Sequence, residues 1–349
     1  MAGDSKTRRN GDTETLPASA SPRHGVAASG PLPLVLLNPG CNYTTGRSRW
    51  NKVATGLRGR IGEFDVEELR SEGAVKEQVR AAFVRGVRNF AAAGGDGTVN
   101  LVANALLELG EKGIALGAVG LGSSNDFHKP FRKEDYIAGM PVRIEFARAR
   151  SVDVIRIEYE SSGGAGRDPS QNGDSPHFAR YCLLNASIGI TAEGNAFFNT
   201  RTTLIRTLQR VSQDLAVTGA ALRSLFMFKD IPARLVIDGE PALDLPITNL
   251  GIIKRPNFAG SLRYDTEISL DDGRLGVNVT YGLSLFGRVA ALTALSRGRF
   301  QGRPNTLCRH GTDVRVTSEQ EFAVELDGEI VRTSSARFSV IPKAIEVCL

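Results

Sequence analysis

The sequence lacks the features that mark a membrane-spanning protein or one held together by zinc. No apolar run reaches the roughly 18 residues that a bilayer-spanning helix needs, because Arg223 interrupts residues 215–228 and Arg288 interrupts residues 283–295. Only four histidines are present and the four cysteines form no CxxC pair, which argues against a structural zinc site. The N-terminus also lacks the apolar core of a signal peptide. These absences predict a cytoplasmic protein whose contact with any membrane is peripheral.

A strong excess of one charge is also lacking. The 43 Lys and Arg residues exceed the 38 Asp and Glu residues by only five. This balance suits an anionic partner such as a phosphate ligand or an anionic membrane surface, and we expect no nucleic-acid partner. Glycine, in contrast, is abundant at 38 residues, which predicts many tight turns and close approaches of the backbone to a ligand. At about 150 residues per domain, the length of 349 residues predicts two domains.

The order of apolar segments divides the chain into four parts. Residues 1–31 are rich in Ser, Ala, Gly, Pro and charge without periodicity, and we expect a disordered tail. Between residues 32 and 142 short apolar strands alternate with helices, which is typical of an α/β domain with a mostly parallel sheet. Residues 143–326 have the alternating pattern of half-exposed strands and predict a largely antiparallel β domain. We expect residues 327–349 to return to the first domain.

Individual elements are predicted from apolar periodicity. In the first domain we expect strands at 34–37, 64–69, 87–93 and 114–119, and helices at 75–86 and 99–109. In the second domain we expect strands at 155–159, 180–184, 233–237, 275–281, 313–317, 321–326 and 338–341, and helices at 202–228 and 284–296. The Gly- and Ser-rich stretch 161–177 is typical of an inserted hairpin loop.

The most specific motif is Gly94-Gly95-Asp96-Gly97-Thr98, which lies between a predicted strand and a predicted helix. The first N–H groups of a helix are unpaired and its dipole favours negative charge, so this junction suits a phosphate. Thr98 can cap the helix or contact a phosphate oxygen. Asp96 would repel a phosphate unless a divalent cation or a hydrogen-bonding network reconciles them. An ordinary Gly-rich turn with a capping Asp is the alternative.

Two further motifs carry carboxylates. The motif Gly120-Leu121-Gly122-Ser123-Ser124-Asn125-Asp126 follows the next strand, and neighbouring parallel strands end at the same edge of a sheet, so both loops can line one crevice. The motif Asp327-Gly328-Glu329 ends an alternating strand, where a plain hairpin turn is the strong alternative. Asp238-Gly239-Glu240 repeats the same three letters, but only the later copy lies close enough to the C-terminus to return to the first domain.

Together these motifs resemble the catalytic family of diacylglycerol kinases in its soluble bacterial form, a family that includes sphingosine and ceramide kinases. The resemblance runs from about Leu34 to Val347. Its marks are Asn38-Pro39, Gly94 to Thr98, Gly122 to Asp126, Asn185-Ala186-Ser187-Ile188-Gly189, Asp271-Asp272-Gly273 and Asp327-Gly328-Glu329. It implies an α/β domain like that of NAD kinase and phosphofructokinase, followed by a mainly antiparallel β-sandwich that takes the lipid substrate. It also implies a lipid kinase that uses ATP and Mg²⁺, with diacylglycerol as the default acceptor.

The resemblance assigns roles residue by residue. ATP would be surrounded by Asn38, Gly94, Gly95, Asp96, Gly97, Thr98, Val99, Asn100 and Ser123. Asp96 and Asp126 would organise the phosphates and the catalytic magnesium. Asp327 or Glu329 would be the general base that takes the proton from the lipid hydroxyl. Asp272, with the backbone carbonyls of Ser269 and Arg274, would match a second, structural magnesium site.

Two segments bear on partners. Apolar residues are interleaved with arginines over residues 202–228, as in an amphipathic interfacial helix or, equally, in a core helix with a solvated basic face. Residues 281–310 carry five arginines and no acid, which fits either a patch facing an anionic membrane or a scattered solvated surface. A homodimer is left open.

Other functions compete with this interpretation. The loop from Asn38 to Gly46 lacks the Ser-Gly that the family usually places soon after Asn-Pro, and a catalytically silent lipid-binding or regulatory protein of the same fold is therefore an alternative. NAD kinase-like and phosphofructokinase-like enzymes share the Gly-Gly-Asp-Gly loop, but neither explains the Asn-Asp loop together with the late Asp-Gly-Glu. Ceramide and sphingosine-like bases are alternative acceptors.

Overall fold

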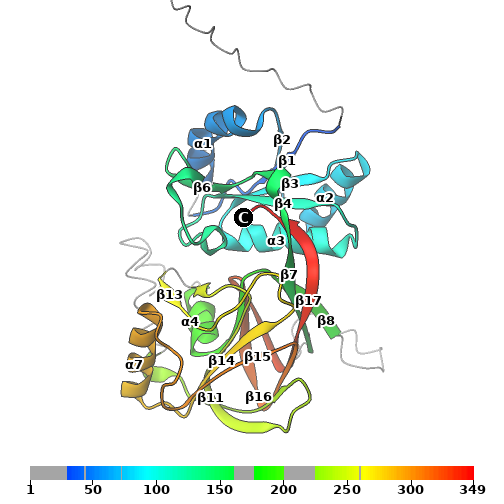
Figure 1. The fold of residues 1–349 in the computed structure, drawn as a ribbon. Helices are drawn as coiled ribbons and strands as arrows, with labels where there is room; N and C mark the ends of the chain where they lie inside the picture. The colour runs from blue at the N-terminus through cyan, green and yellow to red at the C-terminus, as the bar shows by residue number, and fades with distance from the viewer. Residues whose placement is uncertain (1–29, 43–44, 72, 161–176, 200–224, 259–260) are drawn as a thin grey trace, which may run out of the picture. The chain divides into compact units, whose positions relative to one another are not determined.

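Short apolar strands near the N-terminus build an α/β lobe (Figure 1). The computed structural model describes residues 30–42, 45–71, 73–160, 177–199, 225–258 and 261–349. Residues 31–349 form one compact unit. Its parallel strands are β1 (Leu34–Leu37), β2 (Asp65–Glu68), β3 (Asn89–Gly94) and β4 (Ala115–Gly120), in the order β4-β3-β1-β2. The helices that pack on them are α1 (Gly46–Ile61), α2 (Ala74–Val84) and α3 (Asp96–Glu108).

The alternation of side chains along β1 explains why helices cover both faces of this sheet. Leu34 and Leu36 lie in the core that α2 and α3 share. Val35 and Leu37 point to the other face and pack with Trp50 and other side chains of α1. The strand is therefore buried on both faces, as expected for the middle of a parallel sheet.

Antiparallel strands build the β lobe. Its strands are β7 (Arg150–Glu160), β8 (His177–Cys182), β9 (Asn185–Gly189), β10 (Ile231–Ile237), β11 (Leu243–Ile253), β14 (Leu275–Tyr281), β15 (Thr306–Gly311), β16 (Asp313–Leu326) and β17 (Glu329–Val347). Their order is β15-β14-β11-β10-β16-β17, and β9 pairs with both β11 and β16. Apolar side chains from these strands form one core. The predicted architecture, a parallel α/β domain followed by a mainly antiparallel β domain, is confirmed.

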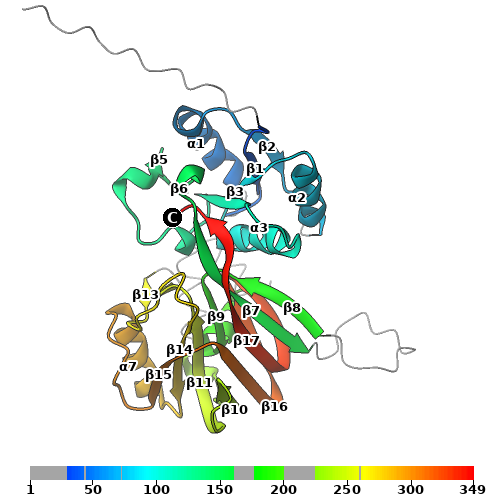
Figure 2. The ribbon, with the colours of Figure 1, turned by 45° about the vertical axis from the view of Figure 1, so that its right-hand side comes forward.

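Two long strands connect the lobes (Figure 2). β7 and β17 pair in antiparallel register from one lobe into the other. Val152 and Val154 of β7 lie in the α/β core, whereas Ile155 and Ile157 of the same strand lie in the β core. The end of β17 then pairs in parallel with β4, through Glu346 and Val347. The end of the C-terminal strand thus joins the N-terminal sheet and lies between β4 and β7.

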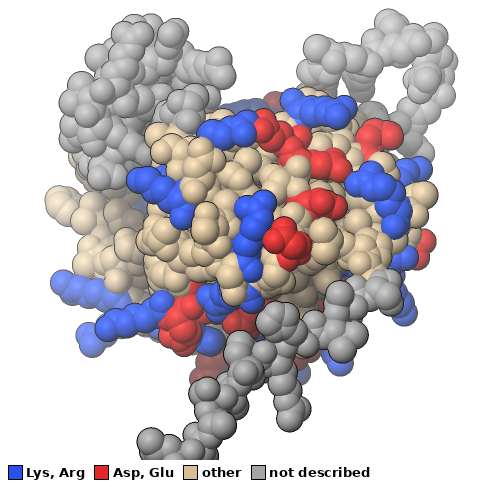
Figure 3. All heavy atoms as spheres, turned by 90° about the horizontal axis from the view of Figure 1, so that it is seen from above, with Lys and Arg blue, Asp and Glu red and all other residues tan. Residues whose placement is uncertain are grey.

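Smaller elements complete the described chain. They are η1 (Asp126–His128), η2 (Lys133–Asp135), β5 (Tyr136–Ile137), β6 (Met140–Arg143), η3 (Phe146–Arg148), α4 (Ile190–Asn199), β12 (Asn257–Phe258), β13 (Leu262–Arg263) and α7 (Leu285–Ser296). Within the described residues no helix is long and apolar enough to cross a bilayer. The end of the α/β lobe seen in Figure 3 mixes Lys and Arg with Asp and Glu side chains, in keeping with the small net charge.

Several elements differ from their predictions. Helix α1, helix α4 and strands β9, β11 and β15 were not predicted from the sequence. The strands predicted at 313–317 and 321–326 are one strand, β16, with an irregularity in its pairing between Thr317 and Phe322. Most of the tail 1–31, of the insertion 161–177 and of the helix predicted at 202–228 lies outside the described residues.

Candidate active site

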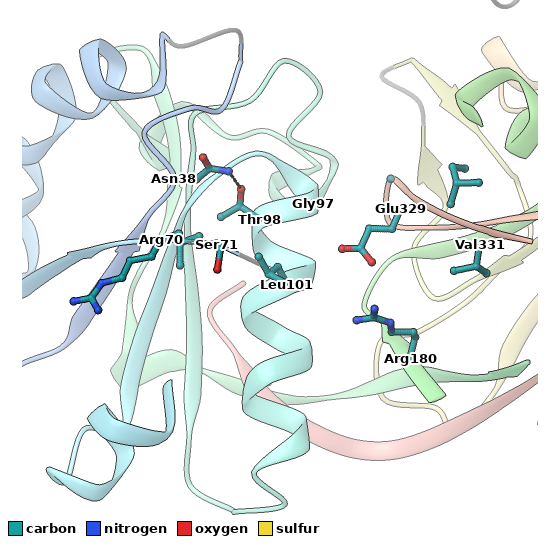
Figure 4. A pocket seen from close by; sticks show the side chains of 12 residues that line it. Asn38, Arg70, Ser71, Gly97, Thr98, Leu101, Arg180, Glu329 and Val331 are labelled. Carbon is teal, nitrogen blue, oxygen red and sulfur yellow. Dashed lines mark hydrogen bonds between the residues drawn. The ribbon is translucent and has the colours of Figure 1, made fainter. Parts of the chain in front are cut away.

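A pocket of about 660 Å³ lies between the two lobes. Its lining from the α/β lobe is Asn38, Leu69, Arg70, Ser71, Gly97, Thr98 and Leu101, and its lining from the β lobe is Arg180, Gly328, Glu329, Ile330 and Val331. Figure 4 shows Arg180 and Glu329 extending from the β lobe toward the first turns of α3. The pocket therefore brings together two of the predicted motifs, which lie more than two hundred residues apart in the sequence.

The Gly-rich turn shapes the α/β side of this pocket. Gly95 precedes α3 in an extended conformation, and Asp96 is the first helical residue. Asn38, directly after β1, donates a hydrogen bond from Nδ2 to Thr98 Oγ1 at 3.0 Å (Figure 4). A Cβ at Gly94 would lie 2.5 Å from Thr98 Cβ, so this position requires glycine. The first predicted loop is thus tied to the second by a side-chain hydrogen bond at the end of two neighbouring strands.

The loop after β4 lies against the Gly-rich turn. A Cβ at Gly122 would lie 2.6 Å from the Cα of Gly95, which shows how closely the two backbones approach. Asn125 adopts a left-handed conformation and its side chain bonds both the N–H and the C=O of Gly122, at 3.1 Å each. Arg49 of α1 donates to the carbonyl of Gly122 at 2.8 Å. Ser123 is exposed at the tip of this loop.

Asp96 and Asp126 meet at this edge of the sheet. Asp96 Oδ1 accepts a hydrogen bond from the Phe127 N–H at 2.9 Å, so its carboxylate lies beside the residue that follows Asp126. The pKa of Asp96 is raised to about 6, mainly by burial and to a lesser extent by the Asp126 and Asp327 carboxylates, while the hydrogen bond from Phe127 acts to lower it. Asp126 forms an ion pair with Lys129. The two carboxylates that the resemblance assigns to the catalytic magnesium are therefore neighbours in the structure.

Asp327 is enclosed by hydrogen-bond donors. Its carboxylate accepts from the backbone N–H groups of Leu183, Leu184 and Asn185 at 2.7–3.1 Å. It also accepts from Cys182 Sγ at 2.8 Å and from Asn100 Nδ2 at 2.9 Å. Burial raises its pKa, but five donors hold it in place, and no lone pair is left to take a proton from a substrate. Asp327 is therefore placed to fasten the hairpin, whereas Glu329 lines the pocket.

Two predicted nucleotide contacts lie inside the protein. The side chain of Val99 packs in the α/β core. Asn100 is buried and donates to Asp327 and to the carbonyl of Tyr181, so it connects α3 to the β lobe. These residues follow Thr98 on α3, where the helix turns its side chains away from the pocket. They position the site without lining it.

Several pocket and support residues were not predicted. Arg70, Ser71 and Arg180 line the pocket, and no motif marked them. Arg255 is half-buried in the β lobe, where it donates to the carbonyl of Phe127 at 2.8 Å and lies over the Phe127 ring. Burial lowers the pKa of Arg255 to about 10. This arginine fixes the turn that carries Asp126, and only the fold brings the two segments together.

The residues predicted to bind a second magnesium ion do not line the pocket. Ser269, Asp272 and Arg274 belong to a turn of the β lobe where the ammonium of Lys254 lies against Asp272. Among the residues that the structure describes, no three His, Cys, Asp or Glu side chains cluster closely enough to hold a metal by themselves. Magnesium in kinases is commonly held by one or two carboxylates together with substrate phosphates, an arrangement that Asp96 and Asp126 fit.

The lobes and the pocket between them define a protein with an α/β domain joined to a mainly antiparallel β domain, and comparisons with known proteins identify its family. The model described as the diacylglycerol kinase catalytic domain matches residues 33–157, and the model described as the YegS C-terminal NAD kinase beta sandwich-like domain matches residues 187–349. The chain belongs to the diacylglycerol kinase catalytic family, as the sequence motifs predicted.

Relatives span nearly the same length. The "Probable lipid kinase YegS-like" of Xanthomonas oryzae pv. oryzae (strain MAFF 311018) is 28% identical over 310 residues, which are 84% of this chain and 89% of the relative. The "Diacylglycerol kinase" of Staphylococcus haemolyticus (strain JCSC1435) is 25% identical over 282 residues, which are 79% of this chain and 76% of the relative.

Solved structures agree in fold. The crystal structure of a diacylglycerol kinase from Bacillus anthracis str. Sterne matches 92% of this chain and 97% of its own, with a TM-score of 0.59 and 15% identity. Another structure from the same organism matches 93% of this chain and 97% of its own chain, with a TM-score of 0.68 and 18% identity. At these identities the similarity establishes the two-lobed fold.

Proposed function

We propose that this protein transfers the γ-phosphoryl group of ATP to the hydroxyl group of a lipid, with diacylglycerol as the first acceptor to test. The observation that carries the proposal is the pocket, in which Asn38, Gly97 and Thr98 of one lobe face Glu329 of the other. Phosphoryl transfer depends mainly on positioning and on neutralising charge at the phosphates. In this pocket the turn at the start of α3 would position the phosphates, and the carboxylate of Glu329 would accept the proton of the acceptor hydroxyl.

The α/β side of the pocket suits the phosphates of the donor. The first backbone N–H groups of a helix lack intrahelical partners, and Gly97, which is in the first turn of α3, presents its backbone without a side chain. Arg180 brings positive charge to the pocket from the β lobe, whereas the side chain of Arg70 points away from α3 (Figure 4). Since phosphate oxygens are negatively charged, these groups would hold the donor in place.

The carboxylates of Asp96 and Asp126 fit a magnesium ion. Carboxylate oxygens are the ligands that this cation prefers, and both side chains lie at the edge of the sheet beside the pocket turn. When bound, Mg²⁺ neutralises negative charge on the transferring phosphoryl group. In the absence of Mg²⁺, the ion pair with Lys129 balances the charge of the Asp126 carboxylate.

Glu329 supports the acceptor half of the reaction. Its carboxylate would accept the proton of the lipid hydroxyl while that oxygen bonds to the γ-phosphorus and the bond from the γ-phosphorus to the leaving ADP oxygen breaks. The hairpin that carries Glu329 is held by Asp327, and by Glu325, whose Oε1 accepts from the Gly328 N–H at 2.7 Å. Substrate deprotonation thus falls to the one carboxylate of this hairpin that lines the pocket.

The test is transfer of label from ATP labelled in its γ-phosphate. Acceptors are mixed micelles of diacylglycerol, ceramide or sphingosine, with NAD as a non-lipid acceptor. Glu329→Gln should lower kcat by roughly 10²- to 10⁴-fold and leave ATP binding intact, whereas Glu111→Gln in an exposed turn should keep full activity. Full turnover in Glu329→Gln would remove this residue from catalysis. ATP binding without transfer to any lipid would favour the silent lipid-binding protein.

We also propose that helix α7 brings the β lobe to a membrane surface. One face of this helix exposes Phe286, Val289 and Leu292, and Phe286 is 87% exposed. Arg288 donates to the carbonyls of Leu225 and Phe228 and so holds a turn with exposed apolar side chains beside α7. A water-soluble lobe gains nothing from such a patch, whereas an interfacial contact buries it. Arg288, one of the five arginines in residues 281–310, binds the carbonyls of this turn and forms an ion pair with Asp230.

Sedimentation with lipid vesicles tests this contact. Phe286→Asp should weaken binding to phosphatidylglycerol-containing vesicles by roughly 10- to 100-fold, because burying one Phe contributes about 1.5–3 kcal/mol. Val84→Asp is the matched control, because Val84 is 80% exposed on α2 in the other lobe. Equal binding of the two variants and the unmodified protein would show that α7 is not the contact.

A further inference from the structure

A buried lysine lies where the family resemblance places a second magnesium ion. Lys254 follows β11, and its side chain has no exposed surface. Its ammonium lies 2.8 Å from Asp272 Oδ1 and 2.8 Å from the carbonyl oxygen of Arg274, which are two of the groups assigned to that ion. The third contact is Asp153 Oδ2 at 2.9 Å, on a carboxylate that is also fully buried.

The three contacts use every donor of the ammonium. A lysine ammonium has three N–H donors and no acceptor, and each donor has one oxygen here. Magnesium would need the same oxygens at about 2.0–2.1 Å in an octahedral shell, which the ammonium prevents by its volume and by its like charge. The residues present therefore do not fit a second divalent cation.

The remaining bonds of the two carboxylates agree with this geometry. Asp272 also accepts from the backbone N–H groups of Ser269 and Arg274, at 3.1 and 3.0 Å. Asp153 also accepts from the N–H groups of Gly273 at 2.7 Å and Lys343 at 3.0 Å. Because each carboxylate is surrounded by donors, the buried ion pair has the compensation that buried charges require.

The lysine lies where the two lobes meet. Asp153 belongs to β7 between Val152 and Val154, whose side chains are in the α/β core. Lys343 lies where the pairing of β17 with β7 shifts register. The ammonium thus connects the end of β11, the 269–274 turn and β7, with β17 joined through Asp153.

We infer that the ammonium of Lys254 takes the place of a structural divalent cation, so that the junction of the lobes is held without a metal. The inference does not rest on the proposed function, because it concerns stability and leaves the catalytic cation of Asp96 and Asp126 untouched. In this chain the junction of the lobes therefore needs no metal, although the family resemblance implies a magnesium ion there.

Thermal unfolding of the full chain without nucleotide tests the inference. The unmodified protein should have the same Tm in EDTA and in millimolar MgCl₂. Lys254→Ser vacates the position and leaves two carboxylates without their cation, so its Tm in EDTA should fall by roughly 10 °C. Millimolar MgCl₂ or CaCl₂ should then recover part of the loss. Lys112→Ser, in an exposed turn, should change neither value.

A second measurement avoids any folding defect of Lys254→Ser. Mn²⁺ bound per chain is counted by electron paramagnetic resonance in the unmodified protein and in Asp272→Asn. Equal counts support the inference, because the second position then holds no metal in either protein. It is overturned if Asp272→Asn binds one Mn²⁺ fewer, or if MgCl₂ raises the Tm of the unmodified protein but not that of Asp272→Asn.

Discussion

Asp327 and Glu329 are two positions apart, yet their surroundings give them different roles. Asp327 is 7% exposed and accepts hydrogen bonds from five donors, whereas Glu329 lines the pocket. We predict that Asp327→Asn lowers the free energy of unfolding by about 2–4 kcal/mol, because an amide N–H₂ then faces donors in a buried site. Urea unfolding followed by circular dichroism measures the loss.

Glu329→Gln is the matched partner in that experiment. Its side chain lies at the pocket, so its unfolding midpoint should equal that of the unmodified protein while its turnover falls. The assignment of roles is wrong if Asp327→Asn is as stable as the unmodified protein, or if Glu329→Gln loses stability and activity together.

Glu325 gives the stability of the protein a pH dependence. Burial, and then the charge of Asp327, raise its pKa to about 7, against 4.5 as its ordinary value. Between these pH values the folded state holds the proton and the unfolded state releases it, so stability falls as the pH rises from about 5 to 8. Glu325→Gln cannot lose a proton, and its urea midpoint should decline less over that range. Parallel declines in the two proteins would exclude Glu325 as a source.

At the scale of elements, two glycines at the junction of β3 and α3 have different roles, one in packing and the other in ligand binding. A Cβ at Gly94 would meet the Thr98 side chain, whereas a Cβ at Gly97 would meet nothing within 4 Å. Gly94→Ala should therefore cost about 1–3 kcal/mol of stability, while Gly97→Ala should cost little and instead weaken ATP binding by narrowing the pocket. Calorimetric titration with ATP and thermal unfolding distinguish the two. Equal losses of stability would contradict this division.

The elements predicted correctly are those whose apolar pattern is continuous. Strands β3 and β4 and helices α2 and α3 have such patterns. Helix α1 carries its buried side chains at Trp50, Val53 and Leu57, which is helical spacing, but arginines and glycines around them hide it. Strand β15 is mostly half-buried or exposed, so it has little apolar alternation to detect.

The residues of the candidate site also divide into those that the sequence could predict and those that only the fold reveals. The Gly-rich turn and the carboxylates were recognisable because each motif is contiguous in sequence. Arg255 and Lys254 were not, because a cation inside the fold is identified by its partners, and Lys254 meets carboxylates 101 and 18 positions away. The role of Asp327 also depended on three backbone N–H groups of another segment. Such side chains become interpretable only when the fold has gathered their partners.

At the scale of the whole molecule, the lobes are joined by more than two strands. β7 and β17 belong to both cores. Asn100 of α3 reaches Asp327, and Arg255 of the β lobe reaches the carbonyl of Phe127. Buried polar links of this kind couple the unfolding of one lobe to that of the other, because breaking them leaves desolvated groups on both sides. We therefore expect the described unit to unfold in a single transition.

The single tryptophan makes this coupling measurable. Trp50 is 6% exposed in the α/β lobe beside Phe64, so its fluorescence reports that lobe, whereas far-ultraviolet circular dichroism reports both lobes. The two signals should change at one urea concentration in the unmodified protein. In the double variant Asn100→Ala, Arg255→Met the two midpoints should separate. Asn51→Ala with Arg299→Met, both exposed, should keep them coincident. Coincident midpoints in the Asn100 and Arg255 variant would mean that these two hydrogen-bonded links do not couple the lobes.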